Sequence, residues 1–124
     1  MIKLSYLMRR LPHMSREEFQ KYWSEKHPSA VPHEAFGTLG IKRYVQVLPL
    51  DTDVRDVVVG PRTGLVEPFD GIAELWVDSL EALERDWSTD QAKEFVQAFF
   101  EDEKNFIDWS RSTILVSEEN VVMP

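Results

Sequence analysis

The order of periodic segments along this 124-residue chain constrains its fold more than any other feature. Residues 2–8, 41–48 and 72–78 alternate between apolar and polar side chains, which is typical of β-strands, and residues 113–116 are predicted as a last strand. Helical patterns separate the first strand from the second and the third from the fourth. This order predicts an α+β fold of the ferredoxin-like (βαββαβ) type, a four-stranded antiparallel sheet with the helices on one face.

Capping patterns locate the first helix. Ser15 and Glu18 have the spacing of a capping box, so the helix is expected to begin there. Trp23 lies on its apolar stripe, and His27 follows one turn later on the same stripe. Because Pro28 disfavours helical geometry in the residue before it, the helix is predicted to end at or just before His27.

The second helical region is expected in two parts. Ser79 would cap a short helix that ends at Trp87. Ser88 and Gln91 form a further capping box in front of a longer helix with a phenylalanine-rich face. The acidic run at residues 101–103 is expected to be a solvated helix end.

Two long connections, residues 28–40 and 49–71, are rich in proline and glycine and are predicted as loops. A connection as long as the second one is uncommon in a compact domain, and such segments are often lids. We therefore expect residues 49–71 to close over a site.

With both helices on one face of the sheet, the other face would lack a cover. It is expected to carry Tyr44, Leu48, Ile72 and Trp76. Monomeric proteins rarely expose an apolar patch of that size. The sequence therefore predicts a homodimer in which two sheets stack face to face.

Composition excludes several classes of protein. The absence of cysteine rules out disulfides, thiolate zinc sites and iron–sulfur clusters. With 14 basic and 22 acidic residues, the net charge of −8 repels phosphate backbones and anionic lipid, so neither a nucleic acid nor a membrane is an expected partner. The apolar runs are too short to span a bilayer, and the N-terminus has no signal-peptide pattern. We expect a single cytoplasmic domain over residues 1–124.

Several segments, in order along the chain, resemble the EthD-like proteins of the dimeric α+β barrel superfamily. They are Leu-Ser-Tyr-Leu-Met-Arg-Arg (4–10), Met-Ser-Arg-Glu-Glu-Phe-Gln-Lys-Tyr-Trp-Ser-Glu-Lys-His-Pro (14–28), Lys-Arg-Tyr-Val-Gln (42–46), Phe-Asp-Gly-Ile-Ala-Glu-Leu-Trp-Val-Asp-Ser (69–79) and Phe-Ile-Asp-Trp-Ser-Arg-Ser-Thr (106–113). The resemblance implies a dimeric α+β barrel with an apolar cleft, between sheet and helices, that holds a flat or ring-shaped substrate.

The resemblance also supplies candidate catalytic residues. His27 matches the family's histidine after the aromatic pair of the first helix and would be the general acid and base; alternatively, it caps the helix end. Tyr44 matches the family's strand tyrosine and would stabilise an oxyanion, unless it is a core residue.

Glu74 is a third candidate catalytic residue. It falls in the middle of a strand, where a carboxylate has to be paired, protonated or facing a cavity. It would relay protons, or form a structural ion pair with Lys42 or Arg43.

Four further side chains are candidate substrate-binding residues: Tyr6, Trp23, Gln46 and Trp76. For the three aromatic residues the alternative is a position in the core, because aromatic residues at regular spacing usually pack there. For Gln46 the alternative is a structural role.

No metal and no cofactor are expected. The histidines, His13, His27 and His33, lack the close spacing of metal ligands. Residues 60–64 do not match a phosphate-binding loop. Several EthD-like relatives have a second histidine after the second strand, where this chain has Leu-Pro-Leu (48–50), which argues against a two-histidine mechanism.

The resulting prediction is a protein that binds a small cyclic or aromatic carbonyl compound, either polyketide-like or a catabolic intermediate. The favoured chemistry is proton transfer without a cofactor, of the dehydratase, cyclase or isomerase type. Two alternatives stay open. One is a cofactor-free monooxygenase, and the other is a non-catalytic accessory protein of a P450 degradation system, as the resemblance to EthD implies.

Overall fold

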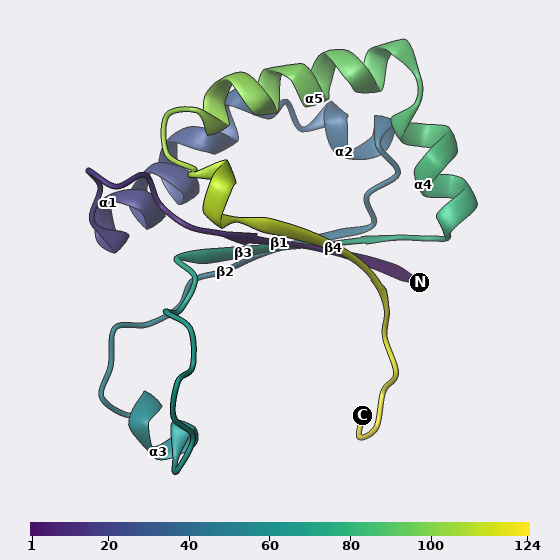
Figure 1. Ribbon diagram of the computed structural model, residues 1–124. Coiled ribbons are helices and arrows are strands. Elements are labelled where there is room, and N and C mark those ends of the chain that lie inside the picture. The colour runs from purple at the N-terminus through teal and green to yellow at the C-terminus, as the bar shows by residue number, and fades with distance from the viewer.

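A four-stranded sheet forms the centre of the molecule, which the computed structural model describes over residues 1–124 (Figure 1). Its strands are β1 (Ile2–Met8), β2 (Arg43–Val47), β3 (Gly71–Val77) and β4 (Thr113–Glu118). They lie in the order β2-β3-β1-β4, and all neighbours are antiparallel. The predicted ferredoxin-like fold is confirmed, and the expected strand ends differ from the observed ones by one or two residues.

The first helical region begins where the capping box predicts. In α1 (Arg16–Lys21), the Ser15 hydroxyl accepts a hydrogen bond from the Glu18 amide and the Glu18 carboxylate accepts one from the Ser15 amide. The chain then continues through a π-helical turn, Tyr22–Lys26, and a 3₁₀ turn, His27–Ala30.

The expectation that residues 28–40 form a loop is wrong in two places. Pro28 lies in the first turn of the 3₁₀ segment, where proline is tolerated because the amide it lacks would have no partner there. A short helix, α2 (Glu34–Thr38), follows before the chain enters β2.

Two helices in the C-terminal half of the chain lie on the same face of the sheet as α1 and α2 (Figure 1). Ser79 caps α4 (Leu80–Trp87), as predicted. The longer helix, α5 (Asp90–Glu103), is capped by Thr89 and not by Ser88. The predicted capping box of Ser88 and Gln91 does not form, because the Ser88 hydroxyl donates a hydrogen bond to the Glu84 carbonyl in the last turn of α4. No helix combines the length and the hydrophobicity that crossing a lipid bilayer requires.

The core lies between this helical layer and the sheet. Gly71 permits the close packing there, because a Cβ atom at this position would lie 2.7 Å from the Trp23 ring. The buried cluster consists of Met8, Phe19, Trp23, Ala73, Phe106 and Ile107.

The register of the strands decides which side chains face the helices. Tyr44 pairs with Leu75 and Val45 pairs with Glu74, and residues that pair across strands share a face. The helix-covered face therefore carries Tyr44, and the uncovered face carries Ile72 and Glu74. The prediction that Tyr44 shares the uncovered face with Ile72 and Trp76 is wrong. Tyr44 pairs with Leu75 and so lies on the opposite face, since a shift of one residue in the pairing of two strands reverses the face.

The connection between β2 and β3 projects from the sheet on the side away from the helices (Figure 1). We call residues 48–70 the arm. It contains a short exposed helix, α3 (Arg55–Val59), where only loop was expected. The C-terminal residues 119–124 leave the sheet on the same side as the arm.

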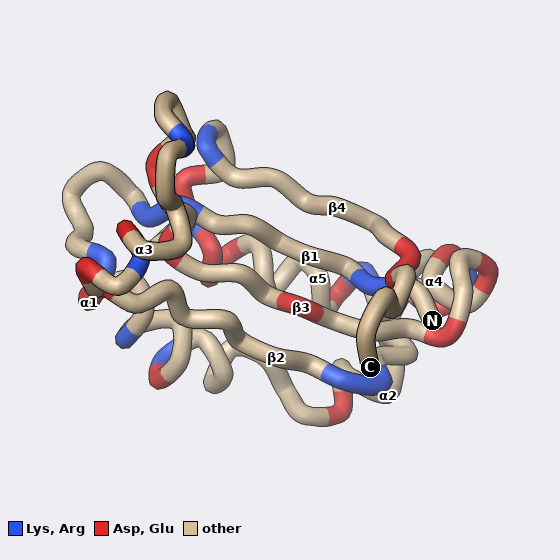
Figure 2. Tube along the Cα trace, turned by 90° about the horizontal axis from the view of Figure 1, so that it is seen from below, with Lys and Arg blue, Asp and Glu red and all other residues tan.

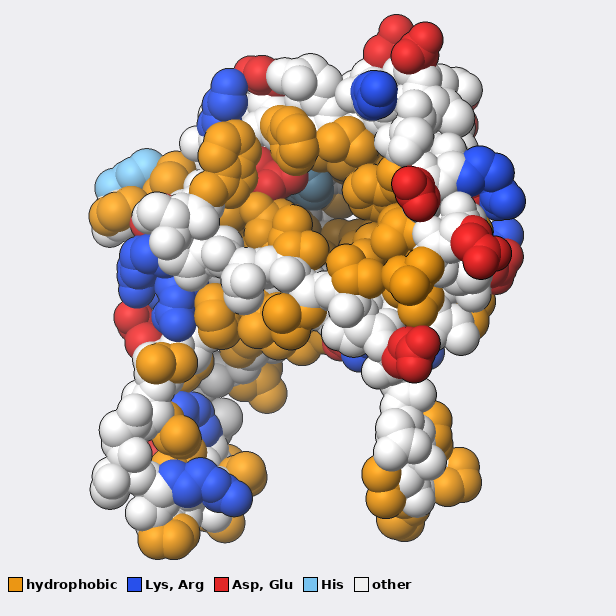
Figure 3. Space-filling view, turned by 45° about the vertical axis from the view of Figure 1, so that its right-hand side comes forward, with side chains coloured by type: hydrophobic (Ala, Val, Ile, Leu, Met, Phe, Trp, Pro, Cys, Tyr) orange, Lys and Arg blue, Asp and Glu red, His pale blue; other side chains and the backbone are white.

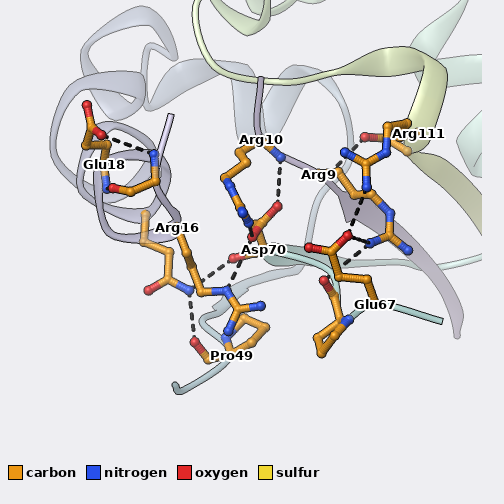
Figure 4. A network of polar contacts seen from close by, with 12 residues as sticks. Arg9, Arg10, Arg16, Glu18, Pro49, Glu67, Asp70 and Arg111 are labelled. Atoms are coloured by element: carbon orange, nitrogen blue, oxygen red, sulfur yellow. Dashed lines mark hydrogen bonds and ion pairs between the residues drawn. The ribbon is translucent and has the colours of Figure 1, made fainter. Parts of the chain in front are cut away.

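A buried carboxylate fixes the base of the arm (Figure 4). The side chain of Asp70, only 3% exposed, accepts hydrogen bonds from the Arg10 amide (2.8 Å) and guanidinium (2.6 Å), and from Arg16 (3.3 Å). The amide of Gln20 donates to the backbone oxygens of both Pro49 and Asp70, each at 3.0 Å. Both ends of the arm are therefore tied to β1 and α1.

Candidate functional site

A cleft of about 1210 Å³ opens between the sheet and the helical layer. Of its 31 lining residues, 20 are hydrophobic, so its chemistry depends on a few polar groups. Figure 3 shows the opening as a hollow with an apolar rim and with acidic and histidine side chains in its depth. No residue of the arm lines the cleft, and the arm lies on the other side of the sheet. The expectation that residues 49–71 cover this cleft is therefore wrong.

His27 lies in the wall of the cleft, at the joint between the π-helical and 3₁₀ turns. Its ring packs against Phe106, with centroids 5.3 Å apart, and against Phe99 at 6.5 Å. Its Nδ1 atom is 2.6 Å from the Asp102 carboxylate on α5. The histidine is therefore joined to a second helix and does not simply cap its own.

Asp102 is held in place by two further donors. The Tyr22 hydroxyl donates to it at 2.7 Å, and Asn105 donates at 3.4 Å. Burial pushes the pKa of the Asp102 carboxyl up, but the hydrogen bonds from Tyr22 and His27 outweigh it and hold the pKa below its usual range. An ionised Asp102 only accepts hydrogen bonds, so the proton of a neutral His27 lies on Nδ1 and the lone pair on Nε2.

The carboxylate of the next residue, Glu103, lines the cleft directly. Glu103 is 9% exposed, and its Oε1 atom accepts hydrogen bonds from the Tyr6 hydroxyl (2.7 Å) and the Trp109 indole (3.1 Å). Burial, and then the contact with Glu103, raise the pKa of Tyr6 far above its usual value. No basic side chain forms an ion pair with Glu103, so hydrogen bonds alone stabilise this carboxylate inside the protein.

A third polar group comes from β2. The amide of Gln46 donates to the Trp23 backbone oxygen (3.3 Å) and to the Tyr44 hydroxyl (3.4 Å). Burial raises the pKa of Tyr44, and the hydrogen bond from Gln46 offsets only part of that effect. The Tyr44 hydroxyl donates to no protein atom, so a neutral phenol with a proton to offer lines the cleft.

The structure brings five of the seven predicted site residues to one cleft. These are His27, Tyr44, Tyr6, Trp23 and Gln46. The rim also includes His33, whereas His13 lies outside the cleft.

Glu74 and Trp76 lie on the opposite face of the sheet and do not reach the cleft. Glu74 forms an ion pair with Lys3 of β1, and not with Lys42 or Arg43. The cations of Lys3 and Arg43 lie 5.0 Å and 4.7 Å from the Trp76 ring. Figure 2, a view of this uncovered face, shows one acidic position midway along β3 and basic positions toward one end of the neighbouring strands β1 and β2.

Sequence reasoning missed two carboxylates of the site. The run at residues 101–103 was expected to be solvated, but only Glu101 is, paired with Lys104 at 3.2 Å. Helical spacing could have found the other two, because Asp102 and Glu103 follow Phe99 by three and four residues and share its inward face. No group of side chains in the molecule has the composition of a metal site.

Comparisons with known proteins agree with this fold. The sequence profile of the EthD domain matches residues 11–110. An EthD family protein from Bacillus halodurans is 18% identical and has a TM-score of 0.60, with 97% of this chain and 99% of the other covered. An EthD-like protein from Ralstonia eutropha is 16% identical at a TM-score of 0.57, covering 98% and 93%.

A third similar structure is a dimeric protein of unknown function with a ferredoxin-like fold, from Bacteroides fragilis. It is 9% identical, with a TM-score of 0.57 and 95% of each chain covered. No curated protein matches the chain significantly.

Proposed function

Because the chain belongs to the EthD domain family, we propose that its apolar cleft binds a small cyclic or aromatic carbonyl compound and transfers a proton on it without a cofactor. One observation carries this proposal, the contact of 2.6 Å between His27 Nδ1 and Asp102 in the wall of the cleft. A carboxylate that orients an imidazole and stabilises its protonated form is a recurrent way to make histidine a base.

In the proposed reaction, Nε2 of His27 removes a proton from the carbon next to the substrate carbonyl. The charge that develops on the carbonyl oxygen needs a hydrogen-bond donor in place before the reaction. Tyr44 is suited to this role, because its hydroxyl has a proton to donate and Gln46 holds its oxygen. Return of the proton from His27 to a different carbon completes an isomerisation, and its delivery to a hydroxyl that leaves as the C–O bond breaks completes the loss of water. In a cyclisation, the carbanion forms a bond to a second carbonyl carbon of the substrate, and His27 gives the proton to the oxygen of that carbonyl.

We also propose that the protein is a homodimer joined through the uncovered face of the sheet. The exposed side chain of Leu115 and the half-buried side chains of Val45, Val47 and Ile72 lie on this face. The arm and the C-terminal residues flank it on two sides and carry exposed apolar side chains, visible on both projections in Figure 3. A second copy of the chain would cover all three surfaces, and the similar protein from Bacteroides fragilis is dimeric.

Solvent exchange on a probe ketone tests the proposed chemistry. In deuterated water, the protein should accelerate exchange of the acidic protons of 2-tetralone, followed by NMR. The His27→Ala variant should lose about 100-fold or more of this rate, since a positioned general base contributes that much. His13→Ala is the matched control, because His13 is exposed and lies outside the cleft, and it should keep the full rate.

The same experiment distinguishes an enzymatic function of this protein from the alternative of a non-catalytic accessory function. Binding of 2-tetralone without accelerated exchange would replace the proposed catalysis by a non-catalytic binding function. Equal rates for the protein and its His27→Ala variant would remove His27 from the proposed mechanism.

A further inference from the structure

We infer that Glu103 selects the ligand, because its free carboxylate oxygen accepts a hydrogen bond from a hydroxyl or N–H group on an aromatic ring. The inference rests on the proposed use of the cleft as a ligand site and adds a chemical class to it. The expected ligand has an aromatic ring with a hydroxyl or N–H donor at one end, in addition to the carbonyl on which His27 acts.

The hydrogen bonds of Glu103 leave one oxygen unused. Oε1 accepts from both Tyr6 and Trp109, whereas Oε2 has no partner in the protein. Every side-chain nitrogen or oxygen that is shut off from solvent does have a partner. Oε2 must therefore be accessible, and the opening beside Glu103 is the cleft that it lines.

The surroundings make this oxygen selective. Glu103 is nine-tenths buried and has no cation beside it, so an apolar ligand that displaces water from Oε2 would leave a charged acceptor unpaired. That loss costs more than the absence of an ordinary hydrogen bond. A ligand with a donor at this position avoids the loss, and one without a donor does not.

Glu103 is also well placed relative to the proposed base. It follows Asp102 directly on α5, and the Cα atoms of consecutive residues are about 3.8 Å apart. Asp102 holds His27, and both His27 and Glu103 line the cleft, so the inference requires one ligand in the cleft to contact both groups.

A pair of probes that differ only in the donor tests this inference. We would measure dissociation constants for 2-naphthol and for its methyl ether by isothermal titration calorimetry. The wild-type protein should prefer 2-naphthol by about tenfold or more, the factor expected for a hydrogen bond to a charged acceptor.

The Glu103→Gln variant should bind the two probes within about twofold of each other. Because the indole of Trp109 can only donate, the glutamine oxygen would stay on Trp109 and its NH₂ group would face the cleft. That group donates equally to a hydroxyl and to an ether oxygen.

A control variant should keep the preference. Glu101→Gln changes an exposed carboxylate on the same helix, two residues before Glu103.

No preference in the wild type, a preference that survives in Glu103→Gln, or no binding of either probe would overturn the inference. These outcomes differ from failure of the proposed catalysis, because the His27→Ala variant should lose exchange and still prefer 2-naphthol. A protein that shows the preference but no exchange keeps the role of Glu103 and loses the catalytic role of His27.

Discussion

Asp102 determines what His27 can do chemically. A histidine at the end of a helix often only caps carbonyl groups, but the 2.6 Å contact with Asp102 gives this ring a fixed orientation and a partner for its protonated form. Tyr22 donates to the other carboxylate oxygen of Asp102. Tyr22 and His27 lie in successive helical turns, 80 and 75 residues before Asp102 in the sequence.

The lowered pKa of Asp102 predicts a stability difference that depends on pH. A lowered pKa means that folding favours the ionised form of the Asp102 carboxyl. The resulting stabilisation is fully present above pH 3.8, the ordinary pKa of an aspartate. It is lost as the pH falls through the lower pKa that Asp102 has in the folded protein. Asp102→Asn should therefore be less stable than the wild type by about 1–3 kcal/mol at pH 7, and the gap should close in acid. Urea unfolding at several pH values measures it.

Asp51→Asn is the matched control, because Asp51 is exposed on the arm, and it should show no such gap at any pH. A gap between wild type and Asp102→Asn that stays constant from pH 7 to pH 3 would contradict the assignment of the hydrogen bonds to ionised Asp102.

At the scale of elements, two joints position the site and the arm. The π-helical turn after α1 makes the His27 amide bond to the Tyr22 carbonyl, five residues earlier, and thereby changes the direction in which His27 leaves the helix. Asp70 joins the end of the arm to the end of β1 and the start of α1. The joint at Asp70 depends on contacts between residues 54 and 60 positions apart, which a local sequence pattern does not contain.

Removing the Asp70 side chain should destabilise the whole fold. Asp70→Ala leaves the guanidinium groups of Arg10 and Arg16 without their buried partner, which typically costs about 3–5 kcal/mol. Chemical denaturation measures the loss. Asp56→Ala, at an exposed position of α3, should cost less than about 0.5 kcal/mol. A loss below about 1 kcal/mol for Asp70→Ala would show that the arm is held by other contacts.

At the scale of the whole molecule, the two faces of the sheet have different tasks. One face forms the floor of the cleft, and the other is uncovered and flanked by the arm and the C-terminal residues (Figures 1 and 3). The uncovered face is not purely apolar, because Lys3 and Glu74 form an ion pair at its centre. A partner surface that fits this face needs apolar side chains opposite Leu115, Val45 and Val47, and polar or charged side chains opposite the Lys3–Glu74 pair.

The proposed dimer has a direct test. Light scattering at micromolar concentration should give twice the mass of one chain, and Leu115→Glu should reduce it to one. Leu115 is 48% exposed in the single chain, so the variant should remain folded. Leu80→Glu, at a 57% exposed position of α4, is the matched control and should stay dimeric. A monomeric wild type would refute the proposal.

Local patterns in the sequence determined the order of elements, the capping of α1 and α4, and hence the fold, because capping and periodicity depend only on neighbouring residues. Motifs that resemble those of EthD-like proteins pointed to His27 and Tyr44, and both line the cleft. The tertiary structure alone decided the register of β2 against β3, since a 23-residue connection does not set it. This register places Tyr44 and Glu74 on opposite faces of the sheet. It also decided which partners Asp102 and Glu103 have. Helical spacing puts both on the inward face of α5, but Tyr22, His27, Tyr6 and Trp109 meet them only after the helices pack on the sheet.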